Sequence, residues 1–213
     1  CQNRKCPAQI KGQIEHYVSK NCMNIDGLGN KIIELLINNK LINDFSDLYS
    51  LDKDDIAPLD RMGEKSAQNI IDAINKSKNT TLARYINGLG IRNVGLNSSK
   101  LLEKSFDGNL DSLMKSSKDE LLNINEIGEI MADSILEYFS NNDNQLLIKK
   151  CVDGGLLFQK IKKAKNTIIT GKTFVFTGTL NQMNRNDAKK IPIPTNNEFN
   201  ILIENYHYLI HYN

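Results

Sequence analysis

Apolar residues recur along the chain in a short pattern that is repeated four times. The pattern consists of an apolar residue, two variable residues, a second apolar residue and a glycine. Its copies are residues 25–29, 59–63, 91–95 and 124–128. The final glycines, Gly29, Gly63, Gly95 and Gly128, are separated by 34, 32 and 33 residues. This regular spacing predicts one structural unit repeated in tandem.

The residues after each glycine predict a helix with one buried face. Four positions after the glycine the chain has mostly small residues: Ile33, Ala67, Ser99 and Ala132. Seven positions after it the chain has apolar residues: Leu36, Ile70, Leu102 and Ile135. Positions four and seven lie on the same face of a helix. Small residues on that face allow a second helix to approach closely.

The segments before the glycines also favour helices, for example 44–51, 79–89 and 117–124, the last with Ser117 as a candidate N-cap. Each unit is therefore predicted to be a helix, a tight hairpin and a second helix. We expect the glycine at the end of the hairpin to serve a turn that needs a positive φ or a close backbone approach.

Composition supports a mainly α-helical globular chain. Of 213 residues, 40% are hydrophobic and 24% charged, only four are proline and none is tryptophan. The sequence contains no run of about 18 apolar residues, so it predicts no membrane-spanning helix. The net charge is only +2, from 27 basic and 25 acidic residues. Binding to nucleic acid would therefore depend on local geometry and not on a bulk basic field.

The hairpins are candidate phosphate-binding sites. A turn that enters a helix N-terminus points free N–H groups outward, where the helix dipole adds partial positive charge. The predicted DNA-binding residues are Gly27, Leu28, Gly29, Lys31, Arg61, Met62, Gly63, Lys65, Arg92, Asn93, Val94 and Gly95. The fourth hairpin carries Glu126 and Glu129, which would repel phosphate, so we expect it to be mainly structural. The alternative is that all four units pack for stability alone.

Cys1 and Cys6, followed by Pro7, have a spacing that is typical of half a four-thiolate zinc site. Cys22 lies beside apolar residues and is predicted to be a buried thiol. Disulfide bonds are not expected. Because the chain begins with Cys and not Met, we interpret it as part of a longer protein.

The last third of the chain changes in character. Residues 140–151 favour a helix that ends at Gly154 and Gly155, and the lysine-rich segment 159–172 is either a solvated linker or a basic strap along DNA. Residues 171–180 predict a strand and 185–191 a short helix. The tail 192–213 suggests a frameshift or a mistaken gene end, and its pattern fits either a helix or a strand.

Together these features resemble the C-terminal part of bacterial NAD-dependent DNA ligases over roughly residues 1–190. Cys1 and Cys6 are similar to the second half of that family's four-cysteine zinc finger. The segments 16–29, 61–67 and 89–95 are similar to its helix-hairpin-helix domain, and 171–180 resembles the first strand of its BRCT domain.

The resemblance implies a mainly α fold of four tandem helix-hairpin-helix units, with half a zinc finger before them and a truncated α/β BRCT start after them. The implied segments are 1–22 for the zinc-finger half and lead-in, 23–140 for the helix-hairpin-helix domain, 141–170 for a helical extension and basic linker, 171–191 for the BRCT start and 192–213 for an aberrant tail.

The implied function is to grip nicked double-stranded DNA for a cytoplasmic, monomeric ligase that seals nicks in replication and repair. The family's adenylation motif, Lys-x-Asp-Gly, is absent from this sequence. NAD and Mg²⁺ would therefore be handled by domains outside this chain, zinc would find only half its ligands, and the chain alone is expected to be inactive. The alternative is a stand-alone, non-enzymatic DNA-binding module, since other repair proteins also use such arrays.

Overall fold

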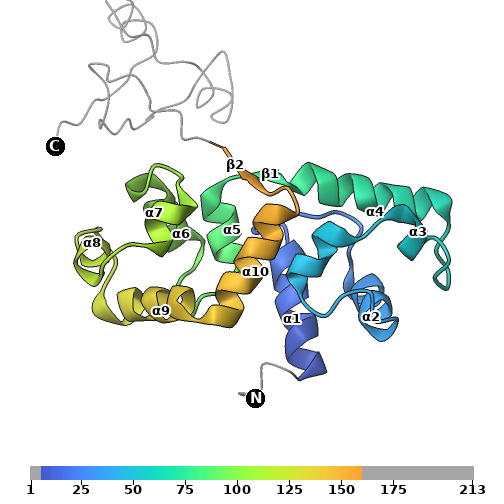
Figure 1. Ribbon diagram of the computed structural model, residues 1–213, viewed down its shortest axis with the longest axis horizontal. Helices are drawn as coiled ribbons and strands as arrows, with labels where there is room; N and C mark the ends of the chain where they lie inside the picture. Colours follow the sequence, from blue (N-terminus) through green and yellow to red (C-terminus); the bar gives the residue numbers. More distant parts are fainter. Residues whose placement is uncertain (1–5, 160–213) are drawn as a thin grey trace, which may run out of the picture. The chain divides into compact units, whose positions relative to one another are not determined.

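Each of the four predicted hairpins connects two helices in the computed structural model, which describes residues 6–159 (Figure 1). We number the hairpins 1 to 4 in chain order, for residues 25–29, 59–63, 91–95 and 124–128. The helices that follow them are α2 (Asn30–Asn38), α4 (Glu64–Ser77), α6 (Leu96–Ser105) and α9 (Glu129–Ser140). The helices that precede them are α1 (Pro7–Val18), α3 (Lys53–Ile56), α5 (Leu82–Gly88) and α8 (Lys118–Leu122). The predicted helix-hairpin-helix order is confirmed.

The short elements differ from the prediction, because polar side chains divide the chain into separate pieces. Segment 44–51 is a 3₁₀ helix, η1 (Phe45–Ser50), and a capping box between Asp52 and Asp55 then begins α3, which the sequence pattern did not reveal. Segment 79–89 is split in the same way: β1 (Asn79–Thr80) comes first, and the Thr81 side chain caps α5 by accepting from the N–H of Arg84. The short helix α7 (Leu110–Met114) was also not predicted. Ser117 caps α8, as expected.

The last described helix agrees with the sequence pattern, whereas the strand after it was not predicted. Helix α10 (Asn142–Asp153) is capped by Asn141 and ends at Gly154. It leads into β2 (Leu157–Phe158), which pairs in parallel with β1, Asn79 opposite Leu157 and Thr80 opposite Phe158. Cys1, the expected BRCT start at 171–191 and the tail 192–213 lie outside the described residues.

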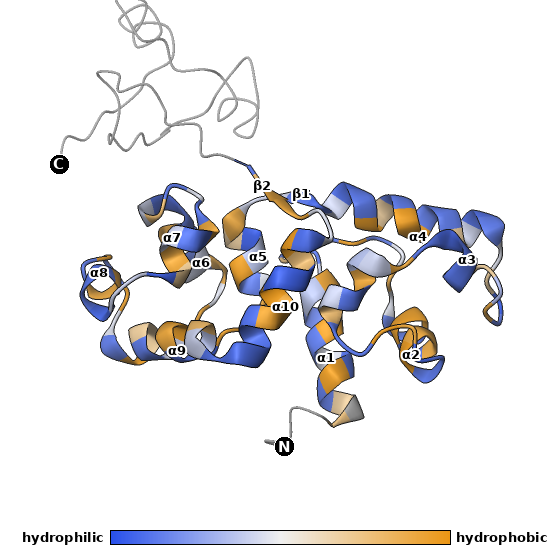
Figure 2. Ribbon diagram, viewed as in Figure 1, coloured by the Kyte–Doolittle hydropathy of each residue, from blue (hydrophilic) through white to orange (hydrophobic). Residues whose placement is uncertain are grey.

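The core is built from the stripe of residues that follows each hairpin glycine. All eight stripe positions are buried, with Ile70 the most exposed at 3%. The buried hydroxyl of Ser99 donates to the carbonyl oxygen of Gly95 at 2.9 Å, so its burial leaves no polar atom unpaired. Helix α4 shows the separation of a buried and an exposed face clearly, because polar and apolar residues follow opposite sides of it (Figure 2).

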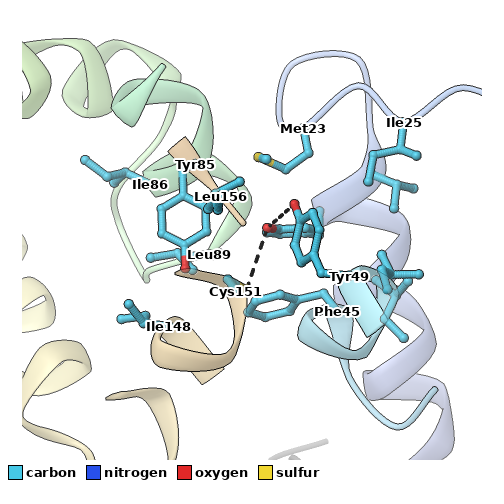
Figure 3. Packing of buried hydrophobic residues seen from close by; sticks show 14 of the residues in the cluster. Met23, Ile25, Phe45, Tyr49, Tyr85, Ile86, Leu89, Ile148, Cys151 and Leu156 are labelled. Atoms are coloured by element: carbon cyan, nitrogen blue, oxygen red, sulfur yellow. Dashed lines mark hydrogen bonds between the residues drawn. The ribbon is translucent and has the colours of Figure 1, made fainter. Parts of the chain in front are cut away.

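A buried aromatic cluster joins the first two units to the last two (Figure 3). The ring of Tyr17 in α1 stacks on Phe45, with ring centroids 4.4 Å apart, and meets Tyr85 of α5 edge-on at 6.3 Å. Its hydroxyl lies 2.9 Å from the hydroxyl of Tyr49 and 3.9 Å from the sulfur of Cys151 in α10. Helix α10 packs against both η1 and α9, so the cluster lies where early and late segments of the chain meet.

Two further features of the described residues bear on the sequence analysis. Cys22 is fully buried, as predicted, and its sulfur lies 3.1 Å from the side-chain amide nitrogen of Asn87, which donates to it. Of the helices within residues 6–159, none combines the length and the apolar character that crossing a bilayer requires.

Two glycines predict opposite effects of the same substitution. An added Cβ at Gly154 would lie 2.6 Å from the Cβ of Tyr49, so Gly154→Ala should lower the free energy of unfolding by about 1–3 kcal/mol. Gly12 lies within α1 and a Cβ there would meet nothing within 4 Å, so Gly12→Ala should raise it by about 0.5–1 kcal/mol. Urea unfolding of both variants measures this difference, and equal effects would contradict the described packing around α10.

The buried cluster also predicts a pH dependence of stability. Burial raises the pKa of the Cys151 thiol to about 12, whereas an unfolded thiol ionises near pH ~8.5. The folded state therefore keeps a proton that the unfolded state loses. The stabilisation is complete below pH ~8.5 and should fall above it by up to about 1.4 kcal/mol per pH unit.

Urea unfolding between about pH 7.5 and 9.5 measures this slope, on the approach to the ionisation of tyrosine near pH ~10. Cys151→Ala should be less stable but show a flatter decline. Cys6→Ala removes a thiol outside the core and serves as the control. An undiminished slope in Cys151→Ala would show that this thiol is not the source.

Candidate nucleic-acid interface

The hairpin turns have a positive φ, but at a different position from the one expected. The final glycines are extended, with φ of −77° at Gly29 and −162° at Gly63. The positive φ lies two residues earlier, at 88° for Gly27, 59° for Arg61, 63° for Asn93 and 68° for Glu126. Of the two alternatives expected for the final glycine, a positive φ at that residue is therefore wrong, and a close backbone approach stays a prediction. The conformation belongs to the third residue of the turn, where a type II turn requires it.

Backbone hydrogen bonds close hairpins 2 to 4 in the same way. The N–H of Met62 donates to the carbonyl of Leu59 at 3.0 Å, that of Val94 to Ile91 at 3.0 Å, and that of Ile127 to Ile124 at 3.1 Å. The two apolar residues of the repeated pattern are thus the first and fourth residues of the turn. They are mostly buried, which turns the variable residues between them toward solvent.

The final glycines are N-caps whose surroundings are empty. A Cβ at Gly29, Gly63, Gly95 or Gly128 would meet no atom within 4 Å. Their φ values are ones that any residue adopts, and the folded chain leaves room for a side chain. Neither strain nor packing within the described residues therefore explains a glycine there. The backbone at these positions is open to a ligand from outside.

The helices after the hairpins also lack the side-chain caps that most other helices have. Helices α2, α4, α6 and α9 have no side-chain hydrogen bond at the N-cap. In contrast, side chains cap η1, α3, α5, α7, α8 and α10; the capping residues are Asp44, Asp52, Thr81, Asn109, Ser117 and Asn141. The first N–H groups of a helix have no partner within it. The four hairpins therefore present free donors at the positive end of a helix dipole.

Cations accompany the first three hairpins. Lys31 and Lys65 follow their glycines by two residues and are exposed, as is Arg92. The Arg61 side chain is 90% exposed, and its Nε lies 3.7 Å from a carboxylate oxygen of Asp60, a surface contact of little energetic weight. The positive charges of these four side chains are thus free to meet an anion.

Hairpin 4 has the opposite character. Glu126 and Glu129 are exposed, and the position that corresponds to Lys31 and Lys65 is occupied by Ile130, which is 75% exposed. This hairpin has the same backbone geometry as the others but an electrostatic field that disfavours phosphate.

The hairpins are arranged as two pairs. Gly27 of hairpin 1 lies against α4, because a Cβ at Gly27 would be 3.4 Å from Cγ1 of Ile70. Asn93, at the same turn position in hairpin 3, donates from its side-chain amide to the hydroxyl of Ser134 in α9 at 3.3 Å. In each pair the first turn therefore contacts the helix that follows the second turn. The sequence repeat did not reveal this pairing, since Ile70 and Ser134 occupy different positions after their glycines.

Comparisons with known proteins give the same division. The model of the SAM-like helix-hairpin-helix tandem matches residues 21–76, and that of the helix-hairpin-helix motif matches 84–148. Over 195 residues the chain is 46% identical to a DNA ligase of Anoxybacillus flavithermus, and over 197 residues 45% identical to one of Clostridioides difficile. These alignments cover 89% and 90% of the chain.

This chain is homologous to a segment of bacterial DNA ligases. It spans 29% of the length of the two ligases named above, and likewise 29% of the Bacillus subtilis DNA ligase, to which it is 43% identical. The two helix-hairpin-helix matches within the ligase segment contain one pair of hairpins each, 1 with 2 and 3 with 4.

The described residues of this ligase segment do not form a zinc site by themselves. Cys6 is the N-cap of α1, and Cys1 lies outside the described residues. Within residues 6–159 no three His, Cys, Asp or Glu side chains are placed to hold a metal ion. Zinc binding by Cys1 and Cys6 stays a prediction that needs ligands from elsewhere.

The positive φ of Glu126 predicts a stabilising substitution in the ligase segment. A side chain in this conformation is strained by about 1–2 kcal/mol, so Glu126→Gly should raise the free energy of unfolding by up to about 1 kcal/mol. Glu137→Gly removes the same charge from the exposed face of α9, where glycine should cost about 1 kcal/mol. Urea unfolding compares the two, and destabilisation by Glu126→Gly would contradict the described turn.

Proposed function

We propose that this chain binds double-stranded DNA through the phosphates of its backbone. The observation that carries the proposal is the set of uncapped helices behind open glycines. Six other helices of residues 6–159 satisfy their first N–H groups with a side chain, whereas the four hairpin helices do not. A phosphate oxygen would supply the missing acceptor, and the absent Cβ lets it approach the backbone.

The proposed contacts come from hairpins 1 to 3. They are the backbone of 27–29, 61–63 and 92–95, assisted by Lys31 and Lys65. Hairpin 4 would contribute to packing, because Glu126 and Glu129 repel phosphate. Backbone N–H groups reach phosphates and not base edges, so binding should be insensitive to base sequence and steeply dependent on salt.

We further propose that this grip serves an NAD-dependent DNA ligase that seals nicks in replication and repair. The relatives are named DNA ligases, and the chain corresponds to under a third of their length. A complete enzyme of that family would transfer AMP from NAD to a lysine, cap the 5′-phosphate with AMP and then form the phosphodiester bond. This chain lacks the Lys-x-Asp-Gly motif, so its role would be to hold the nicked duplex while Mg²⁺ and NAD act on other domains.

The grip can be tested with substitutions that cap the helices from within. In Gly63→Asp, Gly95→Asp the new carboxylates should accept from the free N–H groups, fill the open space and repel phosphate. We expect the free energy of unfolding to stay the same or to rise by well under ~1 kcal/mol. The affinity for a nicked duplex at about 0.1 M salt should nevertheless fall by at least about tenfold, through the loss of charge-assisted contacts.

The matched control is Gly128→Asp in hairpin 4, which should leave DNA affinity nearly unchanged. Fluorescence anisotropy with a labelled nicked duplex measures the DNA affinity of the wild type, the double glycine variant and this control. Arg61→Glu, Arg92→Glu should weaken binding as well, because it reverses two exposed charges of the proposed contacts. If neither double variant loses affinity, the hairpins are not the DNA-binding surface.

A further inference from the structure

A second basic feature lies where the first pair of hairpins meets the second. It is a cavity of about 400 Å³ beside the small sheet. Its walls come from the loop after α1, the C-terminal end of α4, β1 and the start of α5, which adjoin one another in the fold (Figure 1). None of the residues assigned above to the hairpin contacts lines it.

The lining is strongly basic. Lys20, Lys76 and Arg84 come from three separate elements, and among the described residues no Asp or Glu lines the cavity. The ion pairs found within residues 6–159 involve other side chains, so these three charges are not matched by a salt bridge there. Three cations held around one hollow repel one another unless an anion joins them.

Arg84 is held in place for such a role. One terminal nitrogen of its guanidinium donates to the carbonyl oxygen of Lys20 at 2.6 Å, and the backbone N–H of Arg84 donates to the Thr81 hydroxyl at 3.3 Å. A guanidinium has five N–H donors, so most remain available. The planar fork suits two oxygens of a phosphate group.

The rest of the lining fits a phosphate better than a nucleobase. It offers amide and hydroxyl groups, among them Asn21, Asn24, Asn79 and Gln159, which can donate further hydrogen bonds. Among the lining residues none is aromatic, and Met23 is the one large apolar side chain. A base would find no ring on which to stack.

We propose that this cavity is a phosphate-binding site in which Arg84, Lys20 and Lys76 hold a backbone phosphate of the bound duplex. The inference rests on the proposed function, because the duplex is the source of the phosphate. The cavity would add a contact between the stretches of DNA that the two hairpin pairs hold. A free phosphate ion has the same chemistry, so the test includes it separately.

The test compares two variants of the full chain with equal charge. Lys20→Gln, Lys76→Gln removes two lysines of the cavity, and Lys104→Gln, Lys149→Gln removes two exposed lysines that line neither the cavity nor a hairpin. The dissociation constant for a nicked duplex is measured over a salt titration, with thermal unfolding to verify the fold. In the cavity variant the fall of log K with log salt should become shallower: the slope should decrease in magnitude by about 1, the value for one phosphate. The control should keep the wild-type slope.

A second arm titrates inorganic phosphate into the wild type and the cavity variant, following the backbone amide signals of residues 76–84 by NMR. A changed DNA slope supports the site with a duplex phosphate as its ligand. Phosphate-dependent shifts that vanish in the variant, with an unchanged DNA slope, support the site with free phosphate as its ligand. If the slope matches the control and phosphate causes no shifts, the proposal is overturned.

The hairpin variants separate this outcome from the proposed function. In one outcome the wild type binds DNA, the variant Gly63→Asp, Gly95→Asp binds it more weakly, and the cavity variant behaves as the control. The proposed function then stands and only the cavity contact fails. If the wild type does not bind the duplex at all, the proposed function fails, and the phosphate titration alone decides whether the cavity is an anion site.

Discussion

The burial of Tyr17 between early and late helices is the interaction on which the arrangement of the hairpins depends. A repeated unit buries one stripe and therefore needs a neighbour, but the stripes alone do not fix how the first pair meets the second. Tyr17 packs against Phe45 and Tyr85 and bonds to Tyr49, so α1, η1 and α5 meet at one side chain. Helix α10 closes the cluster with Cys151. Burial raises the pKa of both tyrosine partners, which keeps the cluster neutral.

This core allows the surface to remain unsatisfied where a ligand would bind. A capping side chain stabilises a helix by about 0.5–2 kcal/mol, and the hairpin helices forgo it. The turns before these helices also hold side chains at positive φ, such as Arg61 and Asn93. These costs fall on exposed turns, where water can meet the free N–H groups. The buried stripes, with Leu36 and Leu102 fully inaccessible, supply the stability that offsets them.

The sequence predicted what is periodic and missed what is local. Because a helix places positions four and seven on one face, the buried stripe could be read from the repeat, and Ser117 and Gly154 could be recognised as ends. The short helices α3 and α7 have too few residues for a period. The turn position with positive φ is occupied by Gly27, Arg61, Asn93 and Glu126, four residue types with no shared signal. The cavity around Arg84 arises from segments far apart in the chain, so no local pattern could indicate it.

The net charge of +2 fits the proposed way of binding DNA. A protein that attracts DNA by its overall field needs an excess of basic residues. Here basic residues barely outnumber acidic ones, but exposed cations lie beside hairpins 1 to 3 and further cations line the cavity at the junction of the pairs. Hairpin 4 repeats the backbone geometry without the charge, with Glu126 in the turn and exposed Ile130 where the first two units have lysine. If geometry alone sufficed, hairpin 4 would bind phosphate as the others do; if charge alone sufficed, the open glycines would be unnecessary. Comparing Gly63 and Gly128 variants therefore separates the two contributions within one fold.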